Sequence, residues 1–252
     1  MSEELHPQSG RAQRWATWTV SMLNGAVGDY LRARDNGLAV DMAFYHQGRY
    51  LPLTAAAIRQ AHPAPTAKLC ILVHGLGCHE AIWTYPAPDA PERIVSYGAL
   101  LQEELGYTPF FVRYNTGLGL AENGRRLATL LVELAACYPV PIEEIVLIGH
   151  SMGGLITRHA CHFAVQHRMV WVLKVTHIFY LGSPHEGAPL ARFGHAATSA
   201  LHAIPNPITQ LIGNIFDQRS QGIKDLRSAP SIGGAGPAPA PDGTGPALDQ
   251  PM

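Results

Sequence analysis

Residues 144–154 read Glu-Ile-Val-Leu-Ile-Gly-His-Ser-Met-Gly-Gly, and this stretch decides the fold. Residues 144–148 are typical of a buried strand, and the helical pattern of residues 152–167 follows at once. The Gly-x-Ser-x-Gly spacing between them is typical of a tight strand–turn–helix junction, which lifts a serine hydroxyl above the sheet. The glycines on either side supply the small residues that such a turn needs. The stretch therefore predicts that Ser151 is an exposed nucleophile.

Strands and helices alternate on both sides of this stretch. The continuous apolar run at residues 69–73 predicts a strand that is buried on both faces. Further strands are expected at 109–114 and within 170–181, helices near 94–106 and at 121–137, and a hairpin around Gly48 in residues 39–53. This alternation predicts an α/β fold with a doubly wound, mostly parallel sheet and helices on both faces.

Changes in composition divide the chain into three parts. We expect residues 1–38 to form an N-terminal helical extension and residues 39–227 to form the α/β domain, with a candidate lid at 190–216. Residues 228–252 are rich in Pro, Gly and Ala, a composition that buries little apolar surface, so we expect a disordered tail. We also expect the last strand or strands of the sheet to be missing, as a truncated gene or a shifted reading frame would cause.

The overall composition excludes several classes of function. Hydrophobic residues make up 47% of the chain and the formal net charge is −1, so a large core can form and no basic block attracts nucleic acid. Neither a cleavable leader nor a membrane-spanning run is evident, which predicts a cytoplasmic protein. Docking of the N-terminal helix on a membrane surface is the lesser alternative. The spacing of the cysteines and histidines predicts no metal site, and no glycine-rich motif predicts a nucleotide cofactor.

Two further motifs accompany the serine stretch. Residues 73–77 read Val-His-Gly-Leu-Gly directly after the first core strand, and residues 182–187 read Gly-Ser-Pro-His-Glu-Gly. Together with Gly-His-Ser-Met-Gly-Gly at 149–154, these motifs resemble the bacterial lipase and esterase branch of the α/β-hydrolase superfamily. The resemblance extends over residues 68–190.

The resemblance implies a function and part of a site. It implies a serine hydrolase of carboxylic esters, which forms an acyl-enzyme on Ser151 and takes a small-molecule or lipid ester as its substrate. The backbone N–H groups of Leu76 and Met152 would form the oxyanion hole. In that branch, the histidines that correspond to His150 and His185 are not the catalytic base.

The motifs do not reveal the general base or its acid partner. Hydrolases of this kind place their catalytic residues in the chain order Ser, acid, His. Glu186 is the one acidic residue between Ser151 and His202, so Glu186 with His195 or His202 is the candidate set that obeys this order. His177 lies inside an expected strand, and we expect it in the core. Two other functions stay open: an acyltransferase or thioesterase on the same fold, and an impaired hydrolase that only binds acyl ligands.

Overall fold

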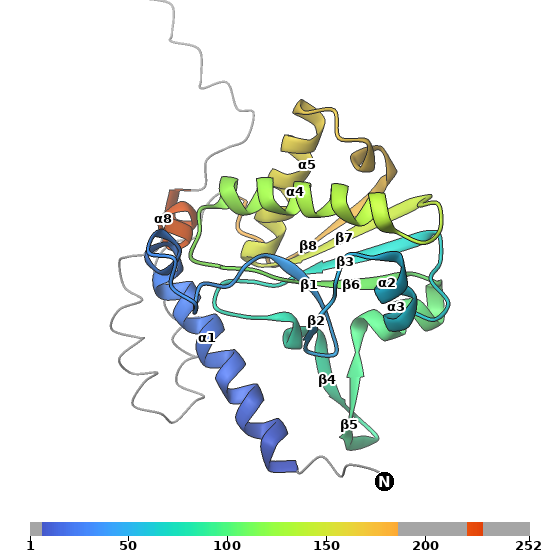
Figure 1. Cartoon of the computed structure of the whole chain (residues 1–252), viewed down its shortest axis with the longest axis horizontal. Coiled ribbons are helices and arrows are strands. Elements are labelled where there is room, and N and C mark those ends of the chain that lie inside the picture. The colour runs from blue at the N-terminus through green and yellow to red at the C-terminus, as the bar shows by residue number, and fades with distance from the viewer. Residues whose placement is uncertain (1–6, 186–220, 229–252) are drawn as a thin grey trace, which may run out of the picture.

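The computed structural model describes residues 7–185 and 221–228 (Figure 1). Its main sheet has six strands in the order β2-β1-β6-β3-β7-β8, and a separate two-stranded sheet pairs β4 with β5. Strands β6, β3, β7 and β8 are parallel, whereas β1 pairs antiparallel with both β2 and β6. The structure therefore confirms the expected mostly parallel sheet of an α/β-hydrolase fold.

The bounds of the elements follow the expected alternation closely. The strands are β1 (Ala43–His46), β2 (Arg49–Tyr50), β3 (Lys68–Val73), β4 (Thr84–Ala87), β5 (Ala90–Ser96), β6 (Thr108–Arg113), β7 (Glu144–His150) and β8 (Val175–Leu181). The helices are α1 (Pro7–Ala33), α2 (Ala55–Ala61), α3 (Tyr97–Leu105), α4 (Leu120–Cys137), α5 (Met152–Gln166) and α8 (Gln221–Ser228), with short 3₁₀ helices η1 (Glu80–Trp83) and η2 (Val170–Lys174).

Strand β3 lies at the centre of the sheet and is buried on both faces. Leu69, Ile71 and Val73 pack on one face into a cluster with the buried leucines of α4 and α5. Cys70 and Leu72 point to the other face, where they meet side chains of η1 and α3. This alternation follows from strand geometry, in which successive side chains point to opposite faces. Helices therefore cover both faces of the sheet, as expected.

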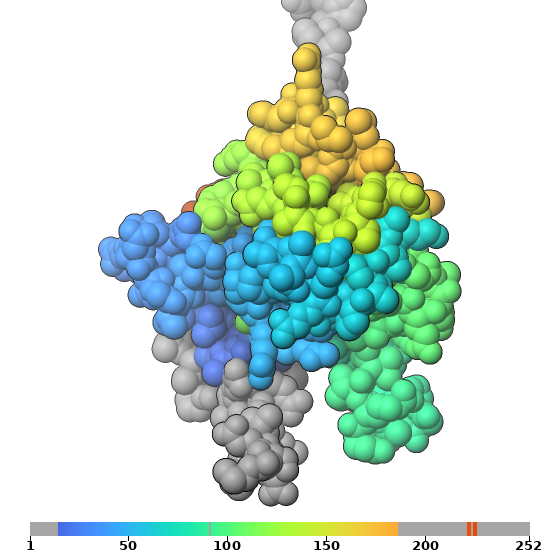
Figure 2. All heavy atoms as spheres, turned by 45° about the vertical axis from the view of Figure 1, so that its right-hand side comes forward, coloured from blue at the N-terminus to red at the C-terminus, as the bar shows by residue number. Residues whose placement is uncertain are grey.

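The structure differs from the expectation in the stretch after β3. The helix expected near 94–106 begins only at Tyr97, because residues 94–96 belong to β5. Strand β5 pairs antiparallel with β4, with Tyr85 opposite Val95. In Figures 1 and 2 this hairpin stands out from the main body of the domain. An isolated hairpin of this kind has little apolar patterning, which is why the sequence did not reveal it.

Helix α1 is kinked at Val27, where φ is −140° and ψ is 23°. Met22 and Ala26 are buried against the domain, whereas Trp15 on the same helix is half exposed. Within the described residues, no helix is both long enough and apolar enough to cross a membrane. The candidate lid at 190–216 and the tail beyond Ser228 lie outside the described residues.

Candidate functional site

Ser151 lies in the turn between β7 and α5. Its backbone has φ 52° and ψ −121°, and a positive φ of this kind is rare in a residue with a side chain. The Ser151 N–H donates a hydrogen bond to the carbonyl oxygen of Leu181 at 2.8 Å, which fastens the turn to the end of β8. Strained backbone persists only where its surroundings hold it in place, and such strain is concentrated at active sites.

Gly153 seats the beginning of α5 directly against the end of β3. A Cβ atom at this position would lie 2.2 Å from the carbonyl oxygen of Val73 and 2.5 Å from that of His74. Both neighbours are backbone atoms, so a larger residue would force the chain apart. The glycine that the sequence motif requires two residues after the serine therefore has a steric cause.

The loop after β3, residues 74–78, packs against the turn that carries Ser151. A Cβ atom on Gly75 would lie 3.1 Å from Ser151 Cβ and 3.1 Å from His150 Nδ1. Met152 is fully buried at the first turn of α5, and Leu76 is partly buried against the core. The structure thus places the loop that carries Leu76 beside the serine and the N-terminus of α5. An oxyanion hole formed by Leu76 and Met152 stays a prediction.

His74 is a buried, neutral residue. Its ring stacks on Tyr114 with 4.4 Å between ring centroids, and its Nδ1 lies 2.9 Å from the carbonyl oxygen of Gly75. Burial lowers the pKa of His74 to about 3, although the contact with Gly75 opposes this shift. Burial also lowers the pKa of His150. His74 is fully enclosed and stacked, which makes it part of the support of the loop.

The third motif begins at the end of β8, next to the same turn. The Nδ1 atom of His185 lies 3.4 Å from Nη1 of Arg158, and its ring meets the edge of Tyr180. Because the guanidinium can only donate, Nδ1 accepts and the proton of a neutral ring lies on Nε2. Burial, followed by the charge of Arg158, lowers the pKa of His185. His185 is thus held by Arg158 and Tyr180.

The structure does not complete the expected catalytic set. Within residues 7–185 and 221–228, no hydrogen bond joins the hydroxyl of Ser151 to a histidine or an acidic side chain. Glu186, His195 and His202 all lie outside the described residues. The expectation for His177 was wrong: its side chain is exposed, because β8 is the last strand of the described sheet and little packs over it.

A buried ion pair that no sequence motif predicts lies next to the loop. Glu80 in η1 accepts two hydrogen bonds from Arg113 at the end of β6, one of them at 2.7 Å. Burial alone would raise the pKa of Glu80, but contacts with His79 and Arg113 outweigh it and lower this pKa to about 2. The aromatic ring of Tyr45 covers the guanidinium. A single charged residue after a loop motif gives no sequence signal of such a partner.

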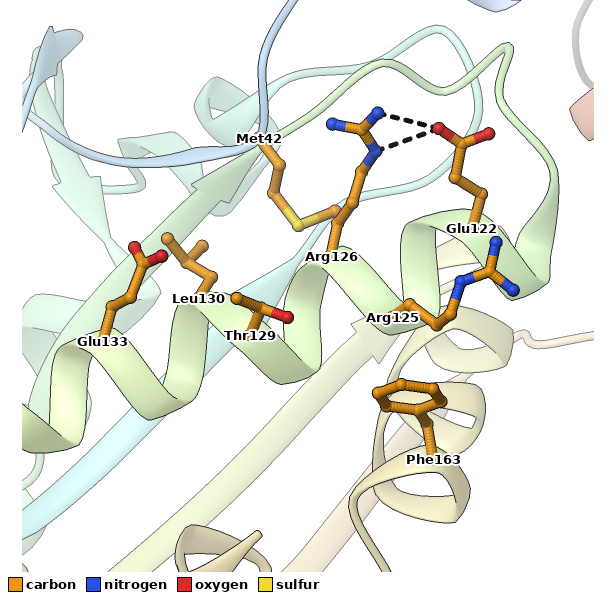
Figure 3. Close-up of a pocket in the computed structure, with 8 residues that line it drawn as sticks. All are labelled: Met42, Glu122, Arg125, Arg126, Thr129, Leu130, Glu133 and Phe163. Atoms are coloured by element: carbon orange, nitrogen blue, oxygen red, sulfur yellow. Dashed lines mark hydrogen bonds and ion pairs between the residues drawn. The ribbon is translucent and has the colours of Figure 1, made fainter. Parts of the chain in front are cut away.

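A pocket with a volume of about 490 Å³ lies on the outer side of α4, away from the residues of the motifs (Figure 3). An ion pair between Glu122 and Arg126 lies along it. Its lining includes neither Ser151 nor Leu76 nor Met152. Within the described residues, no three potential metal ligands lie close enough together to hold an ion.

Comparison with known protein families bears on the stretch that contains Ser151. Residues 116–225 match the PGAP1-like alpha/beta domain, an alpha/beta-hydrolase-type family. The matched stretch contains β7, Ser151, α5 and β8, and it begins after the loop that carries Leu76. No curated protein matches the sequence significantly. The match agrees with the fold seen here, and it is independent of the motif at 73–77.

Proposed function

We propose that this protein is a serine hydrolase that cleaves carboxylic esters through an acyl-enzyme on Ser151. The observation that carries the proposal is the backbone of Ser151, with φ 52° between a parallel strand and a helix N-terminus. A strand-to-helix turn of this kind presents a serine to a substrate in hydrolases of this fold. The similarity of residues 116–225 to an alpha/beta-hydrolase-type family supports the same conclusion.

The proposed reaction has two steps. In the first, Ser151 Oγ bonds to the ester carbonyl carbon, its proton passes to a general base, and the alcohol leaves with a proton from that base. In the second, water attacks the acyl-enzyme, the acid is released, and Ser151 regains its proton. Glu186 with His195 or His202 is the candidate pair of acid and base for both steps.

The oxyanion that forms in each step needs donors that are already in place. The first N–H groups of a helix have no partner within the helix, and the helix dipole adds a partial positive charge there. Met152 begins α5 and therefore offers such an N–H group beside Ser151. The loop with Leu76 packs against the same turn through Gly75. Two donors from these positions would stabilise the oxyanion by several kcal/mol, at roughly 3 kcal/mol for each.

Labelling with a fluorophosphonate and hydrolysis of esters with short and long acyl chains test the proposal directly. Wild type should be labelled once per chain, and Ser151→Ala should abolish labelling and reduce hydrolysis by about 10⁴-fold or more. Ser96→Ala is the control, since Ser96 occupies the N-cap position of α3, outside the three motifs, and its hydroxyl makes no hydrogen bond to that helix. That variant should keep both activities.

Other outcomes would decide against the proposal. Failure of a folded wild-type sample to be labelled would favour an impaired hydrolase that only binds acyl ligands. Transfer of the acyl group to an added alcohol in preference to water would favour an acyltransferase. If ester hydrolysis is found, His195→Ala and His202→Ala measured separately will identify the base, because only one of them should reduce the turnover number by the same order as Ser151→Ala.

A further inference from the structure

We propose that the hydroxyl groups of Tyr114 and Thr116 position the oxyanion loop, residues 74–77, by holding it at both ends. The inference rests on the proposed function of Ser151 and concerns residues outside the three sequence motifs. Both residues belong to the segment that follows β6, so one stretch of chain controls the loop that carries Leu76.

Two hydrogen bonds hold the chain on either side of Leu76. The Tyr114 hydroxyl donates a hydrogen bond to the carbonyl oxygen of His74 at 2.7 Å. The Gly77 N–H donates to Thr116 Oγ1 at 3.0 Å. Leu76 lies between these two anchored residues, so the two bonds restrict the movement of its N–H group. Hydrogen bonds fixed in advance are what an oxyanion hole requires, because it must not reorganise when charge develops.

Burial makes both contacts difficult to replace. Tyr114 is 2% exposed and Thr116 is 1% exposed, so water cannot take over either bond easily. The stacking of the Tyr114 ring on His74 also fixes the direction of the hydroxyl. Burial raises the pKa of Tyr114 well above its usual value, so that the hydroxyl keeps the proton it donates.

Helix α1 packs against the segment that carries Tyr114 and Thr116, the two residues that we call the clamp. Asn115, between the two clamp residues, donates to the carbonyl oxygen of Gly28 at 2.8 Å and accepts from the Gly117 N–H at 3.0 Å. A Cβ atom on Gly25 would lie 3.1 Å from Gly77 Cα and 3.3 Å from Thr116 Oγ1. The kink of α1 at Val27 lies between these two glycines of the helix.

Tyr114 and Thr116 act through the loop and not on the substrate. The hydroxyl proton of Tyr114 is used in its bond to His74, and the Thr116 oxygen is used as the acceptor for Gly77. Loss of either bond should loosen Leu76, which matters most when the negative charge forms on the substrate oxygen. The expected effect is therefore on the turnover number kcat, with little effect on KM.

Four variants test the clamp. We expect Tyr114→Phe and Thr116→Val each to reduce kcat about 10- to 100-fold, with KM within about twofold of wild type. Thr116→Ser keeps a hydroxyl and should restore most of kcat. Tyr138→Phe is the matched control: the Tyr138 hydroxyl donates to the carbonyl oxygen of Thr66 at 2.8 Å in the same manner, so this variant should lose similar thermal stability and keep kcat.

Amide hydrogen exchange provides a readout that does not depend on activity. Exchange across residues 74–78 should be faster in Tyr114→Phe and Thr116→Val than in wild type, and unchanged in Tyr138→Phe. Unchanged exchange in the first two variants would overturn the clamp, whether or not the protein hydrolyses esters. Faster exchange with kcat unchanged, or equal loss in Thr116→Ser and Thr116→Val, would also overturn it. If exchange is faster in Tyr114→Phe and Thr116→Val but the wild-type protein shows no esterase activity, the proposed function alone would be refuted.

Discussion

Strands β3 and β8 are both parallel neighbours of β7, yet their surroundings are opposite. In β3, all five residues after Lys68 are buried, and helices cover both faces. In β8, no residue is fully buried, and Phe179 is 50% exposed although it is as apolar as any core residue. The proposed site lies at the ends of these strands: Gly75 follows β3, Gly153 of α5 packs against the end of β3, and Leu181 is the last residue of β8. The half of the site next to β3 is therefore the more tightly packed one.

The comparison predicts unequal effects of adding one methyl group on the two sides. Gly153→Ala should reduce the free energy of unfolding by about 4 kcal/mol or more, because its Cβ would lie 2.2 Å from the backbone oxygen of Val73. Gly182→Ala, directly after β8, meets no atom within 4 Å, and only its φ of 63° opposes the substitution. We expect a loss of about 1 kcal/mol there.

Chemical denaturation followed by circular dichroism measures both variants of this pair. Fluorophosphonate labelling of the folded fraction adds a second measurement, since Gly153→Ala should also displace Ser151. Equal losses for the two variants would show that β8 is packed as tightly as β3 and would contradict the comparison.

Truncation of leucine on each strand sharpens the same contrast. Leu72→Ala removes a side chain that is 0% exposed at the centre of β3, and we expect a loss of about 3 kcal/mol in the free energy of unfolding. Leu181→Ala removes a side chain that is 44% exposed at the end of β8, and a loss of about 1 kcal/mol or less is expected. Urea titrations of the two variants, compared at equal m-values, provide the measurement. A larger loss for Leu181→Ala would mean that another part of the chain packs on β8.

The same contrast explains what the sequence could predict. Strands and helices whose apolar residues form the core have a strong apolar pattern, either a continuous run or a helical period, and β3, α4, β7 and α5 were predicted within a few residues. His177 was misplaced, because an apolar strand pattern indicates burial only if neighbouring elements cover it. The strand pattern of β8 is present, but the cover is absent among the described residues.

The site shows a similar division. The motifs at residues 73–77 and 149–154 are each continuous in the chain. Their resemblance to known motifs therefore predicted that the loop with Leu76 and the turn with Ser151 belong to one site. Tyr114 and Thr116 act through single hydrogen bonds to residues some 40 positions away in the chain. Contacts of that kind leave no local pattern, and only the parallel pairing of β3 with β6 brings them together.

Acidification should destabilise the protein through His74, which lies directly after β3. His74, directly after β3, is neutral and buried in the folded state with a pKa of about 3, whereas in the unfolded chain it titrates near 6.5. Below pH 6.5 the unfolded state therefore binds the additional proton, and the free energy of unfolding decreases as the pH is lowered. Between pH 6.5 and 5, above the range of ordinary carboxylates, the His74 contribution amounts to about 2 kcal/mol. Free energies of unfolding measured at both pH values should show a shallower fall in His74→Asn than in wild type. A slope unchanged in His74→Asn would show that this histidine is not the group that resists protonation.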